Sequence, residues 1–130
     1  MKPFLDTNIL VYAQQDDPRG DRARALVLAG GTISVQVLNE FANVLRKKLG
    51  RGWMEIAEAL DDVRAALDPA WPLTIETHSA AVALAGEYGF SFFDALIVAA
   101  AVEAGCDTLL TEDLQAGRKI GGLRLVNPFA

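Results

Sequence analysis

Cysteine and histidine are almost absent from the chain, which holds one of each, Cys106 and His78. A single cysteine cannot form an intramolecular disulfide, and the two residues are too small a set for a zinc site. We therefore expect a protein of a reducing, cytoplasmic compartment in which Cys106 is a small core residue. His78 follows Thr77 at the start of a predicted helix, where a solvated or capping role is expected.

Long apolar runs and phosphate-binding loops are absent as well. The longest aliphatic run, residues 95–102, is too short to span a bilayer, and residues 1–6 lack the apolar segment of a secretory signal. No Gly-rich phosphate loop, Walker motif or nucleophile–His–acid set is visible. These absences argue against a membrane protein, a nucleoside-triphosphate enzyme and a triad hydrolase.

What is present fits one domain spanning residues 1–130. The chain is 52% hydrophobic and 22% charged, which is the balance of a globular protein with a real core. Its net charge of −5 argues weakly against nucleic acid, because phosphate binding usually needs a basic face. The positive charges are nevertheless clustered, at Arg46, Lys47, Lys48 and Arg51 and again at Arg118, Lys119 and Arg124. Net charge therefore does not exclude an RNA partner.

Short strand patterns alternate with helical patterns along the chain. Strands are predicted at residues 2–5, 32–35, 73–75, 108–110 and 123–126. Helices are predicted at residues 9–13, 21–29, 38–49, 53–67 and 79–88, and from Ser91 up to Gly105. This alternation indicates an α/β fold, a three-layer sandwich in which helices flank a short central parallel sheet.

Four carboxylates lie where such a fold binds ligands, which is outside the carboxyl ends of the strands. Asp6 and Asp113 follow predicted strands directly. Glu40 lies in the helix after the second strand, and Asp94 opens the helix that leads to the Asp113 strand. Taken singly, each acid has an ordinary structural explanation as a helix cap or a solvated helix residue. Ser91 and Asp94, for example, fit the capping-box pattern.

The surroundings of Glu40 and Asp94 favour a shared site. Glu40 belongs to a polar stripe, with Gln36, Asn43 and Lys47, that flanks the apolar side of its helix. The helix behind Asp94 is apolar on every side, so its carboxylate is expected to be partly desolvated and to need donors or a cation. Acids gathered in one cleft repel one another, and hard cations such as Mg²⁺ or Mn²⁺ take oxygen ligands. The four acids together therefore predict a divalent-metal site.

Four blocks of sequence carry this pattern: FLDTNIL from Phe4, LNEF from Leu38, FDALIVAAA from Phe93 and LTEDL from Leu110. In order and approximate spacing they resemble the PIN-domain family, and within it the VapC-type toxins of prokaryotic toxin–antitoxin pairs. The ending Asn127-Pro128-Phe129 is also similar to theirs. The resemblance covers nearly the whole chain.

The resemblance implies a PIN fold and a Mg²⁺- or Mn²⁺-dependent endoribonuclease that acts as the toxin of a toxin–antitoxin pair. It assigns the catalytic and metal-binding roles to Asp6, Glu40, Asp94 and Asp113, with Thr111 and Asn8 as supporting residues. Its implied partners are an RNA substrate, a cognate antitoxin and a second copy of the chain.

Other residues gain expected roles from this hypothesis. Thr7, with Asn8, would direct polar groups from the start of the first helix towards the phosphate or the metal's waters. Arg46, Lys47 and Arg51 are candidates for RNA contact, although cations are also favoured at a helix C-terminus for structural reasons.

The chain departs from the family pattern at two places. Glu112 occupies a variable position and is either an additional ligand or a surface residue. Phe92-Phe93, before Asp94, is more apolar than the usual entry to that helix, which bears on how substrate fits.

Three alternatives remain open at this point. An inactive PIN-fold module that binds RNA or a partner would share the fold but bind no metal ion. A haloacid-dehalogenase-like phosphatase needs a second aspartate two residues after the first, where this chain has Asn8. A phosphorylation-receiver domain needs paired acids after the first strand and a lysine after the last long strand, where the chain reads Val126-Asn127-Pro128.

Overall fold

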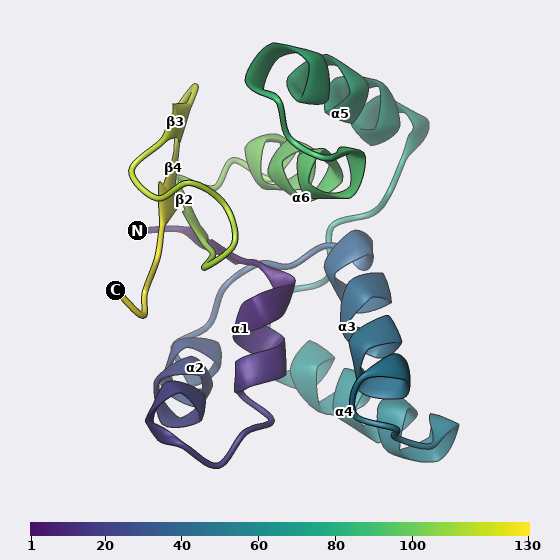
Figure 1. The fold of residues 1–130 in the computed structure, drawn as a ribbon. Coiled ribbons are helices and arrows are strands. Elements are labelled where there is room, and N and C mark those ends of the chain that lie inside the picture. Colours follow the sequence, from purple (N-terminus) through teal and green to yellow (C-terminus); the bar gives the residue numbers. More distant parts are fainter.

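The computed structural model describes residues 1–130, which form six helices and a four-stranded sheet. In chain order the elements are β1 (Pro3–Leu5), α1 (Thr7–Tyr12), α2 (Pro18–Leu28), α3 (Val35–Lys47), α4 (Trp53–Ala66), α5 (Ile75–Tyr88), α6 (Phe92–Glu103), β2 (Thr108–Leu110), β3 (Lys119–Ile120) and β4 (Leu123–Val126). Figure 1 shows α5 and α6 packed together on one side of the sheet, with α1 and α2 on the other. The predicted α/β sandwich is therefore confirmed.

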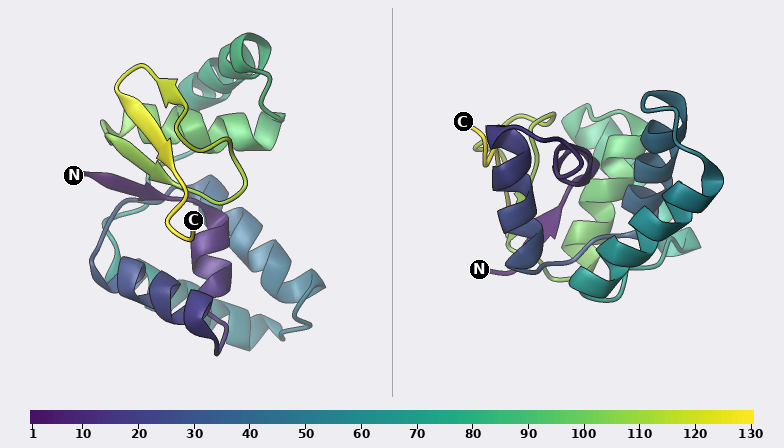
Figure 2. Two further views of the ribbon diagram at one scale, coloured as in Figure 1. Left: turned by 60° about the vertical axis from the view of Figure 1, so that its left-hand side comes forward. Right: turned by 90° about the horizontal axis from the view of Figure 1, so that it is seen from below.

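The strand order is β1-β2-β4-β3. β1 pairs with β2 and β2 pairs with β4 in parallel, whereas β3 runs antiparallel to β4. The hairpin of β3 and β4 lies at one edge of the sheet, as Figure 2 shows. The sheet is therefore parallel except at that edge, in line with the mainly parallel sheet that the sequence predicted. β3 was missed because it is two residues long, which is too short to show a periodic pattern.

The core lies between the sheet and the helices that cover it. Phe4 and Leu5 of β1, Leu109 of β2 and Leu125 of β4 are fully buried. In α6 every residue from position 95 to position 101 is buried, which explains why that helix is apolar on every side. Its first turn, which holds Asp94, reaches the surface, so the buried part of the helix fixes the position of that turn.

Two predicted strands do not form. Residues 32–35 make only two isolated bridges, Thr32 with Phe4 and Ser34 with Trp71, and residues 73–75 make none. In each segment a hydroxyl residue caps a helix instead: Ser34 Oγ accepts from the N–H of Val37 at 3.3 Å, and Thr74 Oγ1 accepts from that of Thr77 at 3.1 Å. The cap satisfies a free N–H of the first turn and starts α3 and α5 earlier than the apolar periodicity suggested.

No single helix is long and apolar enough to cross a membrane. α5 and α6 together pass a test of length and composition, but they meet at a bend of 114°.

Candidate active site

Asp6 is fixed by the pairing of β1 with β2. Leu5 lies opposite Leu110, so the two strands end side by side and bring Asp6 next to Thr111. Thr111 Oγ1 donates to Asp6 Oδ2 at 2.6 Å, and the N–H of Thr7 donates to Oδ1 at 2.7 Å. Asp6 is thus the N-cap of α1, as its position after a strand suggested, and it is also 4% exposed. Burial of this kind is unusual for a simple capping residue.

Glu40 approaches the same place from α3. Its Oε1 accepts from Thr7 Oγ1 at 3.4 Å, and its Oε2 accepts from Gln36 Nε2 at 3.0 Å. Gln36 is one helical turn before Glu40 and is itself buried. The polar stripe that the sequence predicted on this helix therefore orients the carboxylate.

Asn8 joins Asp113 to Asp6. Its Nδ2 donates to Asp113 Oδ2 at 3.1 Å and lies 3.4 Å from Asp6 Oδ2. Its Oδ1 accepts the backbone N–H of Glu112 at 3.3 Å, which fixes the orientation of the amide. Asn8 thereby holds the loop after β2 against the start of α1, in line with the supporting role expected for it.

Asp94 differs from the other three acids. Ser91 Oγ accepts the backbone N–H of Asp94 at 3.3 Å and caps α6. The Asp94 carboxylate makes no hydrogen bond and no ion pair, so the reciprocal half of the expected capping box is wrong. The helix is capped without this carboxylate, which leaves both its oxygens free for another role.

The four acids line one cavity of about 270 Å³. Its ten lining residues are Asp6, Thr7, Asn8, Val11, Tyr12, Glu40, Val44, Lys48, Asp94 and Asp113. The acids come from four separate segments of the chain, and no histidine or cysteine accompanies them. The expected gathering of Asp6, Glu40, Asp94 and Asp113 in one place is therefore what the fold produces.

The acids also act on one another electrostatically. Burial raises the pKa of Asp6 from 3.8 to about 6, against the lowering effect of its bonds to Thr111 and Thr7, and the charges of Glu40 and Asp113 raise it further. Burial likewise raises the pKa of Glu40, with the charges of Asp94 and Asp113 adding to the effect. Negative charge in this cavity is therefore incompletely compensated by the protein.

The donor set of the cavity suits a hard divalent cation. Carboxylate oxygens are the ligands that Mg²⁺ and Mn²⁺ prefer, and such ions keep several of their waters. No three acids converge on one point as the side chains stand, so the acids face a shared volume. An ion that binds through a few carboxylates and its own waters fits this arrangement.

Lys48 lines the cavity, although the sequence analysis did not select it for the site. Glu40, Val44 and Lys48 are spaced by four residues and share one face of the α3 region, which is the signal that could have identified it. Arg46, which was selected, donates to the carbonyl of Arg51 at 3.1 Å and lies 5.1 Å from the ring of Trp53. Nothing in the structure ties Arg46, Lys47 or Arg51 to the cavity.

Glu112 does not line the cavity. Its Oε2 accepts from the hydroxyl of Tyr12, and its Oε1 lies 3.6 Å from Arg19 Nη1. Phe129, near the C-terminus, packs edge-on against Tyr12 with ring centroids 5.1 Å apart. Both carboxylate oxygens of Glu112 are therefore engaged in anchoring the loop after β2 to α1 and α2. Of the two roles considered for Glu112, a surface residue is closer to the structure than an additional metal ligand.

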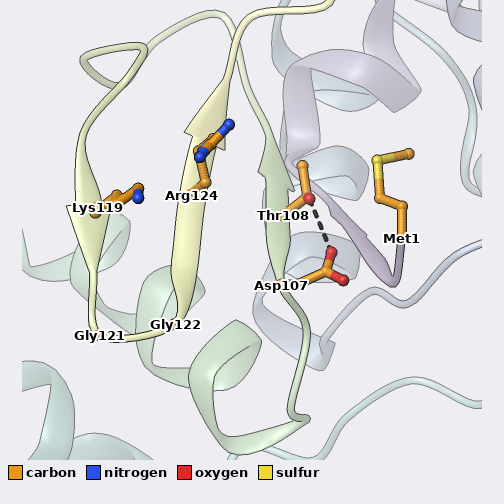
Figure 3. Close-up of a pocket in the computed structure, with 7 residues that line it drawn as sticks. All are labelled: Met1, Asp107, Thr108, Lys119, Gly121, Gly122 and Arg124. Carbon is orange, nitrogen blue, oxygen red and sulfur yellow. Dashed lines mark hydrogen bonds between the residues drawn. The ribbon is translucent and has the colours of Figure 1, made fainter.

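A separate hollow lies at the amino ends of the strands (Figure 3). It is about 370 Å³ and is lined by Met1, Asp107, Thr108, Lys119, Gly121, Gly122 and Arg124. Asp107 is the only acid that lines it, together with the cations Lys119 and Arg124, so no group of carboxylates converges there. The chemistry expected of clustered carboxylates belongs to the other end of the sheet.

Comparisons with known proteins agree with this description. The family model described as PIN domain matches residues 4–120. No curated protein sequence matches the chain. A toxin–antitoxin complex from Klebsiella pneumoniae contains a similar fold, at 21% identity over 98% of each chain and a TM-score of 0.73.

Two further solved structures are similar. VapC20 of Mycobacterium tuberculosis, described as a sarcin–ricin loop cleaving toxin, matches at 21% identity over 86% of this chain and 90% of its own, with a TM-score of 0.70. VapBC2 from Rickettsia felis, bound to a DNA fragment from its promoter, matches at 23% identity over 96% and 97%, with a TM-score of 0.69. At these identities the likeness establishes a shared fold.

Proposed function

The chain belongs to the PIN-domain family, and from that premise we propose that it is a divalent-metal-dependent endoribonuclease that acts as the toxin of a toxin–antitoxin pair. The observation that carries this proposal is the cavity lined by Asp6, Glu40, Asp94 and Asp113. A structural role accounts for one of these acids at a time, but not for the gathering of all four, in which Asp113 opposes the charges of both Asp6 and Glu40 and Asp94 opposes that of Glu40.

In the proposed mechanism Asp6, Glu40, Asp94 and Asp113 would hold one or two Mg²⁺ or Mn²⁺ ions. Bound divalent metal supplies charge neutralisation at the scissile phosphate and lowers the pKa of water, so that a nucleophile exists near neutral pH. The products expected are a 5′-phosphate and a 3′-hydroxyl. The remaining side chains orient the acids: Thr111 holds Asp6, and Asn8 holds Asp113.

Charge around the cavity supports an anionic substrate once metal is bound. Asp6 is buried and Glu40 half-buried, so cations are stabilised there in a medium that screens them less than water does. Lys48 adds a positive charge at the cavity wall and is our candidate for a phosphate contact next to the cleaved bond.

The proposed partners follow the same family relationship. The solved structures with this fold include a toxin–antitoxin complex and VapBC2. We propose that this chain likewise pairs with an antitoxin protein and forms a homodimer. Expression of the chain alone should arrest growth, and co-expression of the protein encoded beside it should relieve the arrest; growth unaffected by an active enzyme would contradict the toxin role.

The enzymatic proposal is tested by RNA cleavage with purified protein. Mg²⁺ or Mn²⁺ should support cleavage, and EDTA should stop it. Asp94→Asn should lose activity by roughly a thousandfold, as expected when several kcal/mol of transition-state stabilisation are removed, while its unfolding temperature stays close to that of the parent. Asp61→Asn, at an exposed position of α4, is the matched control and should retain activity.

Each arm has a contrary outcome. Full activity in a folded Asp94→Asn protein would return Asp94 to a structural role at the start of α6. Cleavage that persists in EDTA would remove the metal from the mechanism. A folded wild-type protein that binds no divalent ion and cleaves no RNA would favour the inactive PIN-fold module.

A further inference from the structure

A second hollow adjoins the acid cavity on α3. It has a volume of about 570 Å³, is open to solvent, and is lined by Gln36, Asn39, Glu40, Asn43 and Phe93. Glu40 lines both this hollow and the acid cavity, and Phe93 is the residue before Asp94. The two hollows are therefore neighbours that share one proposed catalytic acid, Glu40.

Phe93 is an exposed aromatic residue at the start of a buried helix. Its side chain is 62% exposed, although the seven residues from position 95 onwards in the same helix are buried. The neighbouring Phe92 turns inward and packs edge-on against His78, with ring centroids 5.2 Å apart. The ring of Phe93 is tilted against that of Phe92, with centroids 5.8 Å apart, and its exposed surface is available to a ligand.

Two amides share the hollow with this ring. Asn39 and Asn43 are four residues apart and lie on the same exposed face of α3. Neither side chain makes a hydrogen bond within the protein, whereas the amide of Gln36 is used by Glu40. Each free amide offers two donors and one acceptor, and the hollow presents these polar groups beside an aromatic face.

We propose that the hollow formed by Phe93, Asn39 and Asn43 binds one unpaired RNA base next to the phosphodiester that is cleaved. Single-stranded RNA is recognised by stacking of its bases on aromatic side chains and by hydrogen bonds to base edges, and this hollow supplies both. The inference rests on the proposed ribonuclease activity and adds a specificity site to it.

The charge of the hollow selects a base over a phosphate. No lysine or arginine lines it, and Glu40 contributes a negative charge. A phosphate would be repelled there, whereas a neutral base stacks on Phe93 and pairs with uncharged amides. The phosphate contact therefore belongs to the acid cavity with its metal and Lys48, and the base lies on the other side of Glu40.

The experiment pairs changes in the protein with changes in the RNA. Short labelled single-stranded RNAs that carry either a base or an abasic sugar at one position are titrated against the protein in Ca²⁺, which takes the same oxygen ligands, at a temperature at which no cleavage is detected, so that binding is read with the acids neutralised. At one position the wild type should bind the base-containing RNA roughly fivefold to a hundredfold more tightly, the range expected for one stacked base. Phe93→Ala should remove that preference, and Phe93→Tyr should keep it.

Trp53→Ala is the matched control, because Trp53 is an aromatic residue of similar exposure, 64%, that lies on α4 outside the hollow. It should retain the wild-type preference for the base. Asn43→Ala should reduce discrimination among the four bases while the preference for a base over an abasic sugar remains.

A Phe93→Ala protein that still distinguishes base from abasic RNA overturns the subsite. If Phe93→Ala changes the oligomeric state and leaves the RNA preference intact, the ring belongs to a contact between copies of the chain and the proposal is also overturned. In either case, cleavage of RNA by the wild-type protein would still support the proposed ribonuclease function. Failure of the base-binding site can therefore be told apart from failure of that function. Protein that neither binds nor cleaves any RNA contradicts both.

Discussion

Asp6 and Asp107 lie at opposite ends of the paired strands β1 and β2, and each accepts the same two kinds of hydrogen bond. Asp6 accepts from the N–H of Thr7 and the hydroxyl of Thr111, and Asp107 accepts from the N–H of Lys2 and the hydroxyl of Thr108. Their pKa values nevertheless move in opposite directions. That of Asp6 is raised to about 6, and that of Asp107 is lowered.

The difference lies in burial and in the neighbours. Asp6 is buried among other acids, whereas Asp107 is exposed, and the hydrogen bond from Lys2 followed by that from Thr108 lowers its pKa. Hydrogen bonds alone therefore do not distinguish a reactive carboxylate from a structural one in this fold. A reactive carboxylate is distinguished by burial beside other acids, which disfavours its charged form. A bound cation can offset that cost.

The largest expected effect is a difference in RNA cleavage between substitutions at the two ends of β1 and β2. Asp6→Asn should reduce metal-dependent RNA cleavage by roughly a thousandfold or more, because a buried ligand is lost. Asp107→Asn should leave the cleavage rate within about twofold of the parent, since it lies at the far end of the strands. Cleavage assays on the two variants measure this difference. Equal losses of activity would show that the position of an aspartate at one end of the sheet or the other does not determine its role in cleavage.

The second effect concerns stability in EDTA. Because the pKa of Asp6 rises from 3.8 when unfolded to about 6 when folded, the folded chain binds more protons between these values, and its stability falls as the pH rises through them. Such a shift corresponds to roughly 3 kcal/mol. Asp6→Asn should therefore be more stable than wild type at pH 8, by up to about that amount, and the difference should vanish near pH 3.

Urea unfolding at the two pH values measures this difference. Added Mn²⁺ should stabilise the wild type by about 2.7 kcal/mol at a hundred times its dissociation constant and should stabilise Asp6→Asn much less. A variant that is less stable than wild type at pH 8 in EDTA would mean that the hydrogen bonds of Asp6 outweigh its burial.

A smaller effect is expected from the cations at the two ends. Lys48→Gln removes a charge from the wall of the acid cavity, and Lys119→Gln removes one from the opposite hollow. Only Lys48→Gln should weaken RNA binding, by a few-fold, and reduce the slope of log K against log salt by about 0.7. Binding titrations at several salt concentrations test this, and equal slopes for both variants would point to diffuse attraction without a site.

The smallest effect is on Asp107. A lowered pKa stabilises the folded chain above the unfolded pKa, and this contribution is lost as the pH falls through the folded value. Asp107→Asn should therefore have a slightly lower unfolding temperature than wild type at pH 7, and the two should converge at pH 2 to 3. Thermal scans across this range measure it, and a variant more stable than wild type at pH 7 would contradict the opposition between the two ends.

The sequence was sufficient to predict that the acids lie together, but not which hydrogen bonds surround them. Asp6 and Asp113 follow short apolar strands, and strand ends in parallel sheets meet at one edge, so their convergence could be predicted. The free state of the Asp94 carboxylate could not, because a capping box and a lone Ser91 cap have the same sequence pattern. Only tertiary packing decides which of the two forms.

Some elements were also beyond sequence reasoning. The segments at residues 32–35 and 73–75 combine strand-forming residues with the hydroxyl caps Ser34 and Thr74, and the caps prevailed because the following helices are stabilised by burial. The exposure of Phe93 was not visible either, since its neighbour Phe92 is just as apolar and turns inward. Adjacent residues of a helix point in different directions, so one of two equally apolar residues is exposed and the other is packed.

The hydrogen bond from Asn8 to Asp113 joins residues 105 positions apart. On one side β1 makes only an isolated bridge to Thr32, and on the other it pairs with β2, so β1 gains a strand partner only once residues 108–110 have been synthesised. A chain emerging from a ribosome therefore carries Asp6 and Glu40 for most of its synthesis, and Asp94 for a shorter time, before the loop that completes their cavity exists. For a protein proposed to cut RNA, we expect this order of assembly to leave the nascent chain inactive until the loop that carries Asp113 is in place.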